Sequence, residues 1–79
     1  MTPYLKTFFK EKDLPEVTWE LEDNDGVTHI ISNSVVLEAM EQAPDSELHS
    51  IENIIRRIDF ANGDVNDFLK HLAGALINQ

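Results

Sequence analysis

The chain reads DSELHSIENIIRRIDFANGDVNDFLKHLAGALI from residue 45 to residue 77, and this stretch decides the fold. Its apolar residues recur at helical rather than strand spacing in two runs, which predicts two linked amphipathic helices. Between the runs, Gly63 suits the left-handed stop of the first helix and Asp64 suits the cap of the second. Asp67, three residues later, makes an imperfect capping box. The apolar positions are Leu48, Ile51, Ile54, Ile55 and Ile58, then Val65, Phe68, Leu69, Leu72 and Leu76.

A short N-terminal helix is expected at residues 3–12. Thr2 can cap this helix, and Pro3 suits its first position, where the missing N–H costs nothing. Its aromatic and apolar residues share one side, which either docks onto the core or forms a contact surface for a partner. They are Tyr4, Leu5, Phe8 and Phe9.

Residues 17–22 alternate apolar and polar side chains, the turn-forming residues 24–26 follow, and residues 27–31 return as a second β-prone run, which predicts an antiparallel hairpin. A two-residue turn at Asp25-Gly26 would place the apolar side of the second strand beside Glu20 and Glu22. A three-residue turn with Gly26 left-handed instead brings the apolar sides of both strands together, so this register is expected. It leaves Ile30 unexplained on the acidic face.

A further helix is expected at residues 34–43, ended by Pro44, and Asp45 or Ser46 should cap the helix that follows. The order of elements is then α-β-β-α-α-α. The sequence predicts an α+β fold, one domain over residues 1–79, in which a two-stranded hairpin packs on a helical layer.

The charge of the chain excludes several functions. Fifteen acidic and six basic residues give a net charge of −9, and no lysine or arginine lies between Asp13 and Ile55. This field repels phosphates, so direct nucleic-acid binding is not expected. The absence of cysteine excludes disulfides and thiolate chemistry. No apolar run approaches the roughly 20 residues of a membrane span, and the first residues do not resemble a secretory signal, so a cytoplasmic protein is expected.

No catalytic or metal-binding pattern stands out. Asp67 and His71 are four residues apart on the last helix and could form half of a metal site, but no pattern supplies further ligands. His29 falls on the apolar side of the hairpin, where a packed, hydrogen-bonded histidine is expected. The serines lie in no nucleophile elbow and the glycines are isolated. The sequence therefore predicts neither an enzyme nor a cofactor or metal site.

The last helix carries more apolar surface than one side needs. On a wheel of about 100° per residue its apolar residues cover an arc of about 200°. Phe60 projects beside Arg56 rather than with the isoleucines. Either the other elements cover this surface, or part of it meets another chain, which can be a second copy or a hydrophobic partner.

The leading hypothesis is a small acidic, non-enzymatic protein–protein interaction module: an adaptor, assembly factor or regulator with a basic protein partner. The alternative is an acidic nucleic-acid mimic that inhibits a nucleic-acid-binding protein. Arg57 is also expected to clamp a carboxylate, either Asp59 or an acid of the hairpin. The candidate partner-binding residues are Phe60, Phe68, Ile77, Arg56, Arg57, Glu20 and Glu22.

Overall fold

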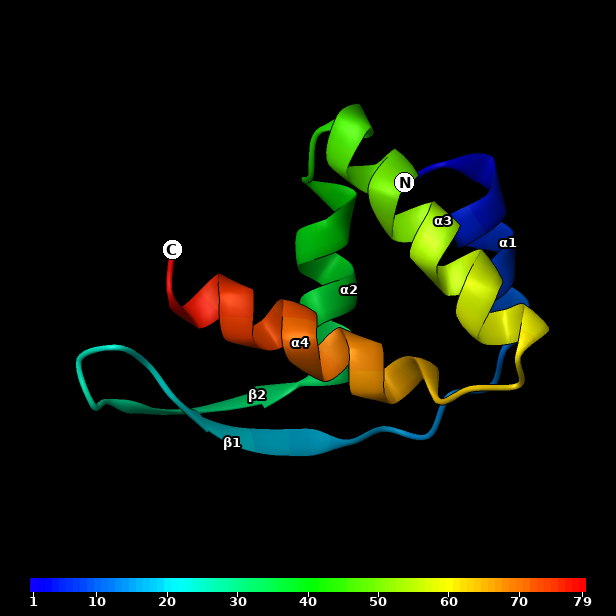
Figure 1. The fold of residues 1–79 in the computed structure, drawn as a ribbon. Helices are drawn as coiled ribbons and strands as arrows, with labels where there is room; N and C mark the ends of the chain where they lie inside the picture. Colours follow the sequence, from blue (N-terminus) through cyan, green and yellow to red (C-terminus); the bar gives the residue numbers. More distant parts are fainter.

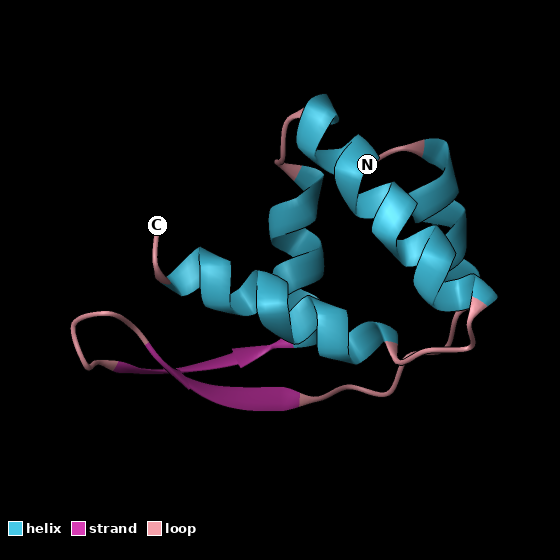
Figure 2. Ribbon diagram, in the orientation of Figure 1, coloured by secondary structure: helices cyan, strands magenta, loops and turns pink.

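A computed structural model describes residues 1–79 and confirms the α-β-β-α-α-α order. Figure 1 shows α1 beside α3 and α4 running along the hairpin, and Figure 2 shows that the hairpin is the only sheet. None of the helices has the length and apolar content needed to cross a membrane. The elements are α1 (Pro3–Glu11), β1 (Thr18–Glu22), β2 (Thr28–Ser32), α2 (Asn33–Glu41), α3 (Asp45–Phe60) and α4 (Val65–Ile77).

The hairpin has the expected register. Trp19 pairs with Ile31, and Leu21 pairs with His29, so these side chains share one face. Gly26 has a φ of +81°, as the three-residue turn requires. The hairpin therefore turns its apolar face toward the helices, where Ile31 is buried.

The helix caps confirm two of the three expectations. The side chains of Thr2 and Asp64 each accept a backbone N–H in the first turn of α1 and α4. By contrast, α3 begins directly after Pro44 and has no side-chain cap, so the cap predicted at Asp45 or Ser46 is wrong. These two residues lie inside the first turn of α3, where the positive end of the helix dipole still stabilises the carboxylate of Asp45.

The turn between α3 and α4 corrects the role of Gly63. The residue with a positive φ is Asn62, at 55°. The N–H of Gly63 donates to the carbonyl of Ile58 at 2.8 Å, and the N–H of Asn62 donates to the carbonyl of Asp59 at 3.1 Å, which is a Schellman ending. A Cβ on Gly63 would lie 3.1 Å from Cγ2 of Ile58. Glycine is thus favoured there by space, and asparagine supplies the left-handed residue.

Eleven buried hydrophobic residues from all four helices and β2 form one core. Ile54, expected on the buried side of α3, is instead 38% exposed. The strand β1 contributes only partly buried residues, so the hairpin covers one side of the core without entering its centre. The core consists of Leu5, Phe8, Ile31, Val36, Met40, Leu48, Ile51, Ile55, Val65, Leu69 and Ala73.

Two buried asparagines join the starts of α2 and α4 to the segment before β1. Nδ2 of Asn33 donates to the carbonyl of Pro15 and to Oδ1 of Asn66, both at 3.0 Å. Nδ2 of Asn66 reaches the same carbonyl at 3.3 Å, and Oδ1 of Asn33 accepts the N–H of Val17 at 3.4 Å. These bonds satisfy polar groups that burial would otherwise penalise. They fix where α4 starts above the hairpin.

Candidate functional site

The residues considered for catalysis or metal binding do not assemble into a site. Asp67 and His71 are exposed on α4 and make no hydrogen bond with each other, and Asp67 does not close the capping box with Asp64. No group of three or more histidine or acidic side chains is placed to hold a metal ion. His29 is hydrogen-bonded as expected, but its side chain is 38% exposed near the hairpin tip rather than packed in the core.

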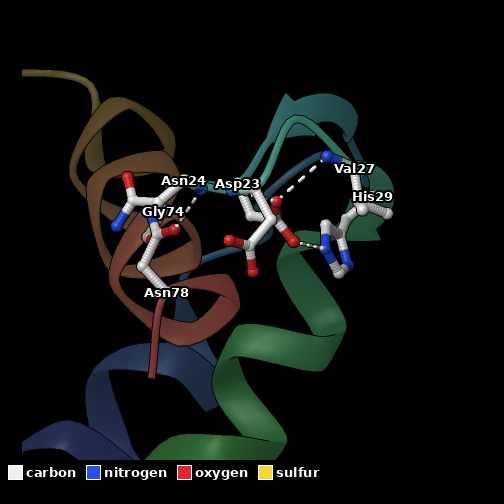
Figure 3. Close-up of polar contacts among 7 residues, drawn as sticks. Asp23, Asn24, Val27, His29, Gly74 and Asn78 are labelled. Carbon is white, nitrogen blue, oxygen red and sulfur yellow. Dashed lines mark hydrogen bonds and ion pairs between the residues drawn. The ribbon is translucent and has the colours of Figure 1, made fainter.

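At the hairpin tip, Asp23 uses both carboxylate oxygens within the turn (Figure 3). Oδ2 lies 2.7 Å from Nε2 of His29, and Oδ1 accepts the backbone N–H groups of Asp25 and Val27 at 2.9 and 3.0 Å. The hydrogen bond from His29, followed by that from Val27, lowers the pKa of Asp23 below its ordinary value. The carboxylate therefore holds the turn together and is not free to act as a base.

The same tip is tied to the end of α4. Oδ1 of Asn78 accepts the N–H of Asn24 at 2.9 Å, while Nδ2 of Asn78 donates to the carbonyl of Gly74 at 3.0 Å (Figure 3). One side chain thus ends α4 and anchors the hairpin. All these polar groups are paired within the chain, which assigns the cluster a structural role.

A second polar cluster joins α1 to α3. The hydroxyl of Thr2 donates to Oε1 of Glu52 at 2.6 Å, and Nε of Arg56 lies 3.3 Å from Oε2 of the same residue. The Thr2 bond, then Arg56, lowers the pKa of Glu52. The guanidinium of Arg56 also stacks 3.8 Å from the ring centroid of Tyr4. Arg56 therefore stabilises the packing of α1 on α3, and it remains about half exposed.

Phe60 and Arg57 lie free at the C-terminal end of α3. Phe60 is 92% exposed, and Arg57 is exposed one turn before it. The clamp expected from Arg57 is wrong, because it makes no ion pair, and Asp59 pairs instead with Lys12 at 3.1 Å. The end of α3 thus presents an aromatic ring beside Arg56 and Arg57. We call Arg56, Arg57 and Phe60 the basic–aromatic knob.

The other predicted partner-binding residues lie elsewhere. Phe68 and Ile77 are partly buried and pack against the core. Glu20 and Glu22 lie on the outer face of the hairpin, where Ile30 pairs with Glu20 and is 72% exposed. The structure therefore does not bring the predicted residues into one surface.

An open groove with an apolar lining lies between α2, the first half of α3 and the second half of α4. It has a volume of about 460 Å³, and eight of its twelve lining residues are hydrophobic. Buried Val36, Met40 and Ile51 form its floor. The sequence feature that indicated part of this groove was the wide apolar arc of the last helix, which contains Leu72 and Leu76. The lining residues are Val36, Ala39, Met40, Gln42, Ala43, Pro44, Glu47, Ile51, Leu72, Ala75, Leu76 and Gln79.

The groove has a negative electrostatic character. Glu47 is its only charged lining residue. The last turns of α2 and α4, both of which border it, contain no basic residue, so their negative dipole ends are not compensated. The positive N-terminal end of α3 is already matched by Asp45 and Glu47. A basic group on a partner would therefore be favoured here.

A second hollow, of about 450 Å³, lies between α1 and α2 and is mostly polar, with three hydrophobic residues among nine. It contains Lys10, Lys12, Asp13 and Glu16, side chains that water solvates well. The groove is the more apolar of the two.

No protein-family model, curated protein or solved structure matches this chain.

Proposed function

We propose that this chain is a small non-enzymatic module that binds another protein, as an adaptor, assembly factor or regulator, and that the groove is its docking surface. The observation that carries the proposal is the groove itself. Its volume of about 460 Å³ falls in the range of ligand sites, but it is open along helices and holds a single titratable side chain, Glu47. Such a surface favours docking over chemistry.

The distribution of polarity along the groove supports the same proposal. Protein interfaces typically have an apolar centre and a polar rim. Here the floor is aliphatic, while Gln42, Glu47 and Gln79 supply polar groups among the lining residues. The negative character of the groove favours a partner that presents basic side chains.

The cytoplasmic location expected from the sequence stays a prediction.

A nucleic-acid mimic is the second candidate. It is supported by the outer face of the hairpin, which displays Glu20 and Glu22 in a stretch without any lysine or arginine. However, Ile30 interrupts that face and is 72% exposed, and this candidate leaves the apolar groove without a role. It predicts that binding to a basic partner weakens steeply with salt and with Glu20→Gln/Glu22→Gln. Insensitivity to both changes would remove it.

Two matched variants test the docking proposal. Ala75 is exposed and lines the groove, so Ala75→Lys places a positive charge on the docking surface, where it repels a basic partner, without touching the core. Asn53 is exposed on α3 and does not line the groove, so Asn53→Lys adds the same charge elsewhere. Each variant is immobilised as the full chain and used to capture proteins from the native cell. Circular dichroism verifies that both fold.

We expect wild type and Asn53→Lys to retain the same partner, and Ala75→Lys to bind it about tenfold more weakly or worse, because it sets a like charge against the basic side chains of the partner. Affinity is then measured on the isolated partner by titration. Equal affinities for the two variants would overturn the groove as the docking surface.

A further inference from the structure

We infer that the basic–aromatic knob of one copy of this chain fits the groove of a second copy, so that the protein associates head to tail through the docking surface. The inference rests on the proposed function in so far as it uses the same groove. It adds an occupant that the chain itself supplies. Self-association would then compete with the partner and regulate access to the groove.

Phe60 is distinguished from the other exposed hydrophobic residues by its surroundings. It is 92% exposed, whereas the next is 72% exposed. The other four all lie within the stretch from Asp13 to Ile55, which contains no base. Phe60 alone has two arginines in the preceding turn. These four residues are Val27, Ile30, Val35 and Ile54.

The knob and the groove are complementary in charge and in polarity. The groove offers aliphatic side chains, one carboxylate at Glu47 and two helix ends of negative character. The knob offers a phenyl ring and the guanidinium of Arg57, which has no ion-pair partner within its own chain. Aromatic residues, phenylalanine among them, and arginine are both enriched at the buried centres of protein interfaces.

The positions of the two surfaces decide the kind of assembly. Glu47 and Ile51 border the groove near the start of α3, whereas Phe60 is its last residue. Nine residues of helix separate Ile51 from Phe60, which is about 13.5 Å along the axis. A knob cannot reach the groove of its own chain across this rigid helix. The contact therefore joins the knob of one copy to the groove of another. In a head-to-tail pair one copy keeps a free groove and the other keeps a free knob, so further copies can add.

The contact should be weak. It buries one aromatic ring and its neighbours, and the net charge of −9 on each copy opposes association. A dissociation constant on the order of 1 mM is expected, as for small interfaces that barely offset the entropy of association. Salt near 0.15 M reduces the Debye length to about 8 Å, which screens the long-range repulsion more than the contact pairs.

Concentration-dependent NMR tests the inference on the purified full chain. Between about 0.05 and about 1 mM protein, a range that brackets weak association, amide shifts should move at the end of α3 and along the groove. Phe60→Ala and Ala75→Lys should each abolish these changes, the second because its charge repels Arg57 of the knob. Phe60→Ala leaves the core intact, because the ring is 92% exposed. Ile30→Ala, which removes another exposed apolar side chain, is the matched control and should retain them.

Mixing the two inactive variants gives the decisive result. Phe60→Ala has an intact groove and Ala75→Lys has an intact knob, so labelled Phe60→Ala should show the groove shifts when unlabelled Ala75→Lys is added. A two-fold interface built from one surface alone, knob against knob or groove against groove, would not be restored in this way. The inference is overturned by constant shifts up to about 1 mM, by shifts that persist in Phe60→Ala, or by a mixture that stays monomeric. If this test fails but capture of a partner depends on Ala75, the proposed function stands. If the chain self-associates but capture does not depend on Ala75, only the proposed function is removed.

Discussion

Replacing Asn33 by alanine removes the hub of the buried amide cluster. Asn33 is 4% exposed, and its amide makes three hydrogen bonds. After Asn33→Ala the carbonyl of Pro15 keeps the bond from Asn66 at 3.3 Å. Oδ1 of Asn66 and the N–H of Val17 lose the partner they have in the native chain. The variant therefore creates two unpaired polar groups at the point where three segments meet.

The cost follows from the burial of these two groups. An unsatisfied buried polar group costs about 1–3 kcal/mol. Asn66 is 8% exposed, whereas Val17 is half-buried and its N–H can reach water at a lower cost. The free energy of unfolding should fall by about 3 kcal/mol. A chain of 79 residues has roughly 4–12 kcal/mol in total, so the loss is a large fraction of it.

Thermal unfolding followed by circular dichroism measures this loss. For a domain of this size 1 kcal/mol corresponds to about 4–8 °C, so Tm should fall by about 12–24 °C. Asn53→Ala is the matched control, because Asn53 is exposed on a helix and should change stability by less than about 0.5 kcal/mol. The double variant Asn33→Ala/Asn66→Ala should cost less than the sum of the single variants, because they share a bond. Equal Tm values for Asn33→Ala and Asn53→Ala would refute the assigned role of the cluster.

Three further outcomes are expected. Leu69→Ala, at a fully buried site of α4, should lower the free energy of unfolding in urea by about 2–5 kcal/mol. Gly63→Ala should destabilise by about 1 kcal/mol in the same assay, because its Cβ would lie 3.1 Å from Cγ2 of Ile58, and a stabilised variant would show that Ile58 moves aside. Because the folded pKa of Asp23 is lowered by His29, its carboxylate stabilises the fold above about pH 4, and this contribution is lost as the pH falls through the folded pKa. Asp23→Asn should therefore flatten the acid side of the stability curve measured by urea unfolding, and an unchanged curve would exclude this linkage.

The hairpin register and the helices could be predicted from local patterns. The side-chain period of a strand is two, so only one register places Trp19 and Leu21 on the same face as Ile31. Helical periodicity likewise located α3 and α4 to within a few residues. The left-handed residue was predicted wrongly as Gly63, because glycine adopts that conformation most readily, whereas Asn62 has the positive φ. The close approach of Ile58 to Gly63 is visible only in the folded chain.

The asparagine cluster and the groove could not be predicted in this way. Asn33 and Asn66 are distant in sequence, and each is an ordinary residue for the start of a helix. The groove depends on the angles at which α2, α3 and α4 pack, and a helical wheel carries no information on those angles. The wide apolar arc of α4 indicated surplus surface, but it did not indicate that α2 and α3 would supply the rest of the lining.

Three alanines line the groove, and they bear on whether its small residues are explained by helix formation or by binding. Ala39 and Ala75 lie within α2 and α4, where alanine has the best helix propensity and needs no other explanation. Ala43 lies beyond the last residue of α2, so helix propensity does not account for it. Ala43 is partly buried at the edge of the core, and any apolar surface that a larger side chain buried there would contribute about 25 cal/mol per Å². A small residue at this position leaves that stabilisation unused, as expected of a surface on which binding opposes further packing.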